Sequence, residues 1–90
     1  MAHSLSAKKR VRQNASRRAL NRWRLRTMRV AIKDFLLAQA SGDVNAATEQ
    51  YRKTASIIDR TAQKGVIHRN QAARRKSRLS AKLKALKTAA

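Results

Sequence analysis

The chain has 90 residues and carries 23 lysines and arginines against four acidic residues, which gives it a formal net charge of +19. This length allows one domain over residues 1–90, and the absence of cysteine excludes disulfides and thiolate metal sites. No apolar run approaches the roughly 20 residues that a transmembrane helix needs, and repulsion among so many like charges favours a polyanionic partner, most commonly a nucleic acid.

The first predicted helix covers about residues 6–40, and its two halves differ in composition. Residues 1–30 contain ten basic residues and no acidic residue, so the first half has too few large apolar side chains to pack and is expected to project. Ser4 or Ser6 is expected to cap its N-terminus. The second half presents an apolar stripe at helical spacing, which we interpret as part of an intramolecular core rather than as a dimer interface. The stripe consists of Leu25, Met28, Ile32, Phe35 and Leu36.

The second predicted helix covers about residues 44–64, where positive and negative charges balance. Residues 31–60 hold four basic residues and all four acidic residues. Gly42 is expected to end the first helix in the left-handed conformation, and Asp43 to cap the second. For Asp59 we favour a surface ion pair, with Lys64 or a cation near Arg60, over a role as general base. The apolar stripe consists of Val44, Ala47, Tyr51, Ala55, Ile58 and Ala62.

The third predicted helix covers about residues 69–86, where the composition is again basic. Residues 61–90 hold nine basic residues and no acidic residue. Gly65, followed by Val66, is expected to end the second helix in a Schellman motif. Asn70 is expected to be a better cap than His68 for the third helix, and the last four residues are expected to fray. The apolar stripe consists of Ala72, Leu79, Leu83 and Leu86.

Together these elements predict an all-α fold. Because short connections make successive helices antiparallel, we expect a three-helix up-down-up bundle with a long, projecting basic first helix. Trp23 lies where that helix would leave the bundle. Two interpretations of this residue stay open at this point: stacking on a nucleic-acid base, or covering the open end of the bundle.

The candidate binding residues lie in the two basic segments, because phosphate binding needs many cations on a rigid element. Residues three or four apart share a helix face, so pairs such as Arg18 and Arg22 present adjacent donors, and arginine forks suit phosphate oxygens. These segments are nearly free of aromatic residues, which favours backbone and shape recognition over base stacking. The candidates are Lys8, Lys9, Arg10, Arg12, Gln13, Asn14, Arg17, Arg18, Asn21, Arg22, Arg24, His68, Arg69, Asn70, Arg74, Arg75, Lys76 and Arg78.

The sequence offers no catalytic or metal-binding constellation. His68 has only His3 as a second histidine and no carboxylate cluster beside it, so we expect no enzymatic activity, no metal and no cofactor. Two other binding functions are weighed. A nucleoid-associated DNA-binding protein is disfavoured because repetitive Pro/Ala/Lys tails are absent, and a membrane-active peptide is disfavoured because the basic stretches lack large apolar faces.

Both basic segments contain long motifs. Residues 6–14 read SAKKRVRQN, and residues 64–79 read KGVIHRNQAARRKSRL. In this order and spacing they resemble the two signatures of the bacterial small-subunit ribosomal protein S20 family. The resemblance spans nearly the whole chain. It implies a three-helix cytoplasmic protein of the ribosome that binds small-subunit ribosomal RNA directly, early in assembly, with no membrane or small-molecule partner.

The crowding of like charges in the first helix leads to a further expectation. Like-charged pairs at helical spacing destabilise a helix by roughly 0.2–0.5 kcal/mol each. We therefore expect residues up to about 22 to be partly disordered in the free protein and to become helical on RNA.

Overall fold

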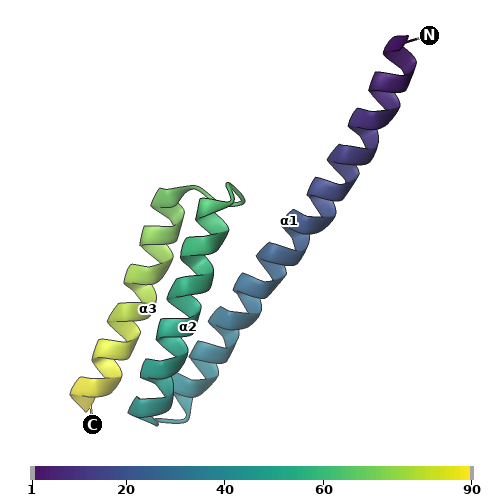
Figure 1. Ribbon diagram of the computed structural model, residues 1–90. Helices are drawn as coiled ribbons and strands as arrows, with labels where there is room; N and C mark the ends of the chain where they lie inside the picture. The colour runs from purple at the N-terminus through teal and green to yellow at the C-terminus, as the bar shows by residue number, and fades with distance from the viewer. Residues whose placement is uncertain (1, 90) are drawn as a thin grey trace.

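Three helices make up the part of the chain that the structure describes. The computed structural model describes residues 2–89, with the side chains of residues 5–89. Helix α1 is Ala2–Ala40, α2 is Val44–Gln63 and α3 is Arg69–Ala89, and residues 2–89 contain no strand. Figure 1 shows the helices running in alternating directions, with the N-terminal half of α1 extending beyond the other two. The predicted all-α, up-down-up arrangement with a long first helix is confirmed.

The outer ends of α1 and α3 extend further than predicted. Helix α1 begins at Ala2, so Ser4 and Ser6 lie inside the helix and the expectation that one of them caps it is wrong. No proline or glycine lies in this stretch to end the helix. Helix α3 continues to Ala89, where the Thr88 hydroxyl donates to the Lys84 carbonyl at 2.9 Å. The helix thus continues three residues beyond its predicted end near residue 86, and residue 90 lies outside the described residues.

The turn between α1 and α2 follows the predicted design. Gly42 has a φ of +81°, in the left-handed region that glycine adopts without a steric penalty. Its N–H donates to the Gln39 carbonyl at 3.1 Å. Asp43 then caps α2, because its Oδ1 accepts from the backbone N–H groups of Asn45 and Ala46 at 3.0 and 3.2 Å. The chain thus reverses direction within three residues.

The turn after α2 is a complete Schellman motif, as predicted. Gly65, with a φ of +76°, donates its N–H to the Ala62 carbonyl at 2.9 Å, and Val66 donates to the Thr61 carbonyl at 3.2 Å. These two bonds satisfy carbonyls that the end of a helix would otherwise leave without partners.

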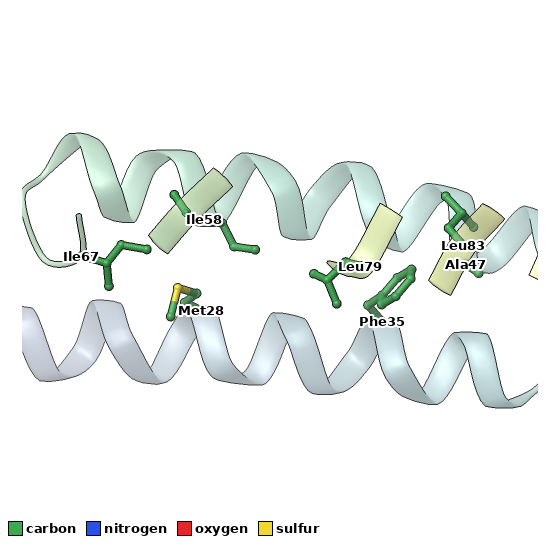
Figure 2. Packing of buried hydrophobic residues seen from close by; sticks show 8 residues of the cluster. Met28, Phe35, Ala47, Ile58, Ile67, Leu79 and Leu83 are labelled. Atoms are coloured by element: carbon green, nitrogen blue, oxygen red, sulfur yellow. The ribbon is translucent and has the colours of Figure 1, made fainter. Parts of the chain in front are cut away.

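The core is shared by all three helices. Met28 and Phe35 of α1 meet Ile58 of α2 and Leu79 and Leu83 of α3, and Figure 2 shows these side chains between the helices. The ring of Phe35 packs edge-on against that of Tyr51, with centroids 6.0 Å apart. The other buried apolar residues are Ala31, Ala47, Ile67 and Ala72.

Two features of the core differ from the predicted stripes. Leu36 is 38% exposed, because one residue corresponds to about 100° of helix rotation and the core side is centred on its neighbour Phe35. Thr54 and Thr61 of α2 are buried although they are polar. The Thr54 hydroxyl donates to the Ala31 carbonyl of α1 at 3.0 Å, and the Thr61 hydroxyl donates to the Ile57 carbonyl at 2.7 Å. Both hydroxyls keep a hydrogen bond, so their burial leaves no unsatisfied donor.

The first half of α1 contributes nothing to this core. Every side chain from residue 5 to residue 22 is exposed. The Cα radius of gyration is 18.0 Å, whereas a compact domain of this length has about 12 Å. The expected projection of the basic N-terminal half of α1 is confirmed, and we call residues 5–22 the arm.

Phe35 is predicted to be the residue on which the bundle depends most. Phe35→Ala should lower the free energy of unfolding by about 3–5 kcal/mol, because the fully buried ring leaves a cavity. Leu37→Ala, which truncates a side chain 60% exposed on the same helix, should change it by no more than about 0.5 kcal/mol. Urea denaturation followed by circular dichroism measures both. Equal losses would show that the core is not where the structure places it.

Candidate nucleic-acid interface

The arm carries cations on every side of the helix. Successive residues are rotated by about 100°, so Lys8, Lys9 and Arg10 point in three different directions, and all three are exposed. Further along the arm, Arg12, Gln13 and Arg17 line one shallow hollow with Lys9. The other predicted residues of the arm, all exposed, are Asn14, Arg18, Asn21 and Arg22.

A row of cations continues from the arm along α1 beside the bundle. Arg22, Arg26, Arg29 and Lys33 line a single surface hollow, and with Arg18 they follow one another at spacings of three or four residues, which places them on one face. This face lies to one side of the core face of Met28 and Phe35, because its residues are rotated from them by roughly a third of a turn. Arg26, Arg29 and Lys33 are absent from the predicted site residues. The continuing helical spacing after Arg22 is the signal that could have found them.

The start of α3 supplies the second basic surface. Arg69, Asn70, Arg74 and Arg78 are exposed, as a binding role requires, whereas Arg75 is half-buried. The Nε of Arg75 is buried and has no hydrogen-bond partner among the described residues. Arg75 therefore lies against the bundle and is less free than its neighbours.

Lys76 is held by an ion pair that sequence reasoning missed. Its Nζ lies 2.7 Å from Oδ1 of Asp59, which joins α3 to α2. The hydrogen bond to Asp59 raises the pKa of the Lys76 ammonium group. The predicted ion pair of Asp59 with Lys64 or a cation near Arg60 is thus wrong, because the partner lies on the neighbouring helix. Among the cations predicted to bind nucleic acid, Lys76 alone has a carboxylate partner in the described residues.

Free positive charge is the dominant property of both surfaces. Within residues 5–89, Lys53 and Lys76 are the only cations with a side-chain nitrogen within 4.0 Å of a carboxylate oxygen. Asp43 has its carboxylate engaged as the cap of α2. The exposed lysines and arginines other than these two are therefore available to an external anion.

His68 is the N-cap of α3, which corrects the predicted cap. Its Nδ1 accepts from the Asn70 N–H at 3.0 Å, and its carbonyl accepts from the Ala72 N–H at 3.1 Å. Asn70 lies inside the helix, so it is not the cap. The ring nitrogen that caps the helix is unavailable to RNA, although the side chain itself is exposed.

The two basic surfaces lie at the same end of the bundle. Figure 1 shows the connection between α2 and α3 beside the part of α1 from which the arm extends, and the turn between α1 and α2 at the opposite end. Asp43 lies in that opposite turn. Up-down-up topology therefore places the two most basic segments, which are far apart in sequence, at the same end of the bundle.

Neither a metal site nor a membrane-spanning helix is found among the described residues. Residues described by the structure include no group of three or more His, Cys, Asp or Glu side chains placed to hold a metal ion. A search of the same residues for a helix with the length and apolarity needed to cross a bilayer finds none.

Comparison with known proteins gives one consistent result. The family model described as Ribosomal protein S20 matches residues 2–84. Two relatives, each named small ribosomal subunit protein bS20, illustrate the similarity. The protein of Acinetobacter baumannii is 52% identical over 86 residues, covering 96% of this chain and 98% of its own. The protein of Nitrosomonas europaea is 50% identical over 86 residues, covering 96% and 99%.

The capping role of His68 predicts a specific pattern of stabilities. His68→Ala should lower the free energy of unfolding by about 0.5–2 kcal/mol, the usual loss for a removed N-cap, and His68→Asn should restore most of it. Asn70→Ala should not lower the free energy of unfolding, because Asn70 lies within the helix and does not cap it. Thermal or urea denaturation distinguishes these variants. A loss on Asn70→Ala with none on His68→Ala would contradict the observed cap.

Proposed function

This chain belongs to the ribosomal protein S20 family, and from that premise we propose that it binds small-subunit ribosomal RNA directly, through the phosphate backbone and the shape of the folded RNA. Membership makes it a structural protein of the small ribosomal subunit, without enzymatic activity, located in the cytoplasm as part of the ribosome. We assign this binding to residues 1–90 as a single domain.

The observation that carries the proposal is the arm. It is a helix of exposed side chains, rich in arginine and lysine, with no carboxylate partner in the described residues and no contribution to the core. A segment of this kind lowers the stability of the isolated protein through charge repulsion. Phosphates remove that repulsion, and the release of condensed counterions adds to the affinity.

Two groups of residues make the proposed contacts. In the arm and the turn of helix after it, arginine forks bind phosphate oxygens in pairs, while amides reach sugar hydroxyls. These residues are Lys8, Lys9, Arg10, Arg12, Gln13, Asn14, Arg17, Arg18, Asn21, Arg22 and Arg24. The second group comes from α3 and the residue before it: His68, Arg69, Asn70, Arg74, Arg75, Lys76 and Arg78. Within it, Arg69, Arg74 and Arg78 are the most accessible cations, since Arg75 is half-buried and Lys76 is paired with Asp59.

Backbone recognition predicts a steep dependence of affinity on salt. If about 6–10 phosphates are engaged, the affinity for ribosomal RNA should fall by about 10³–10⁵-fold between 50 and 200 mM salt. Filter binding or fluorescence anisotropy measures it, with duplex DNA as competitor. A nearly flat response, or equal competition by duplex DNA, would contradict the proposal.

Individual arginines can be tested by how steeply the affinity for ribosomal RNA falls with salt. Each phosphate contact contributes about one unit to the slope of log affinity against log salt, so Arg18→Gln/Arg22→Gln should reduce it by about two. Arg52→Gln, which neutralises an exposed arginine on α2, is the matched control and should leave the slope unchanged. Equal reductions would mean that net charge, not the arm, determines binding.

The arm should also be less helical without RNA. The structure shows its helical form, but no side chain of residues 5–22 is buried to stabilise it, and most of the stability of a helix in a protein comes from tertiary packing. Far-ultraviolet circular dichroism at low salt should show helix content below that of the structure, rising when RNA is added. Helix content equal to that of all three helices in the free protein would contradict this prediction.

A further inference from the structure

A small hollow lies at the point where α1 leaves the bundle. One wall comes from α1 and the other from the C-terminal end of α2, and the cavity volume is about 150 Å³. The two helices separate here because α1 buries no side chain between Met28 and the arm, which begins within two turns of Met28. Its principal lining residues are Trp23, Arg24, Ile57, Arg60, Thr61 and Lys64.

The inside of the hollow is apolar and contains an exposed aromatic ring. Trp23 is 62% exposed, although it is one of the largest apolar side chains in the protein. Ile57 lies beside it, half-buried against the core. The two hydroxyls of the lining already donate to backbone carbonyls: Thr27 to Trp23 at 2.9 Å, and Thr61 to Ile57 at 2.7 Å. The lining thus favours a flat, apolar face and does not require a polar group inside.

The rim of the hollow is positively charged. Arg24 belongs to α1, whereas Arg60 and Lys64 belong to the last turn and the C-cap of α2. No carboxylate oxygen among the described residues lies within 4.0 Å of their side-chain nitrogens. Arg60 is held in place by its Nη2, which donates to the Ser56 hydroxyl at 3.0 Å. An occupant should therefore combine an apolar ring with negative charge around it, and a nucleotide of RNA has this composition.

We propose that this hollow binds one unpaired pyrimidine base of RNA, stacked on Trp23, with the flanking phosphates on Arg24, Arg60 and Lys64. The volume of about 150 Å³ corresponds to a single benzene-sized ring, so it matches the one ring of a pyrimidine more closely than the fused rings of a purine. This proposal rests on the RNA-binding function above and adds a base contact to it. Phosphate contacts alone carry no sequence information, so this base would fix the position of the arm along the RNA.

Trp23 supplies its own reporter, because it is the only tryptophan in the chain. The full-length protein is titrated with oligouridylate, with oligoadenylate, and with an abasic oligomer of the same length and charge. Binding is followed by anisotropy of labelled oligomers, and stacking by tryptophan fluorescence. All three should bind through their phosphates. Oligouridylate should quench Trp23 most strongly, and the abasic oligomer should leave its fluorescence unchanged.

Substitution provides the second readout. Trp23→Ala should weaken binding of oligouridylate by about 5- to 150-fold, the loss expected for one stacked base, and should leave binding of the abasic oligomer unchanged. Leu37→Ala, at an exposed apolar residue of α1 that is 14 residues from Trp23 and does not line its hollow, is the matched control and should affect neither. Circular dichroism of each variant confirms that the bundle is folded.

Three results would overturn the base site: equal quenching by the abasic oligomer, equal quenching by oligoadenylate, or equal affinities of wild type and Trp23→Ala for oligouridylate. These outcomes leave the proposed function intact as long as the ribosomal RNA binds with a steep salt dependence. Loss of ribosomal RNA binding would contradict the proposed function itself. Failure of the base site and failure of the proposed function therefore give different results.

Discussion

Repulsion among the basic side chains is the constraint on which the rest of the structure depends. A net charge of +19 on 90 residues opposes compaction, and the fold separates the charge from the core. The arm carries seven of the 23 lysines and arginines and buries no side chain, while the buried residues of α1 begin at Met28, where α2 and α3 cover them. Carboxylates are placed where they hold the helices: Asp43 caps α2, and Asp59 binds Lys76 between α2 and α3.

Because the core is small, specific contacts between the helices contribute much of the stability of the bundle. Phe35 and Met28 are fully buried against α2 and α3, and the Thr54 hydroxyl binds the Ala31 carbonyl across the interface of α1 and α2. Tight turns at Gly42 and Gly65 limit the freedom of the connections. This bundle sets the direction of the arm and brings the start of α3 to the same end of the molecule (Figure 1).

Features that depend on neighbouring residues in the sequence could be predicted, whereas features that depend on helix rotation could not. The two glycine turns and the stripe of Leu79 and Leu83 follow from local spacing. The pairing of Lys76 with Asp59 depends on how α3 is rotated against α2, which no local pattern contains. The cap at His68 required knowing at which residue the backbone enters the helix. Likewise, the hollow at Trp23 exists only because the end of α2 lies beside it.

The distribution of cations around the arm has a consequence for the shape of its binding site. A helix that lies on a flat surface needs charge along one stripe, and its other side faces solvent. Here Lys8, Lys9 and Arg10 face different directions, and side chains all around residues 5–22 are exposed. An arm of this kind is suited to a channel enclosed by several RNA segments, whose phosphates would contact it from different sides. Bound there, it would hold together RNA strands that repel one another.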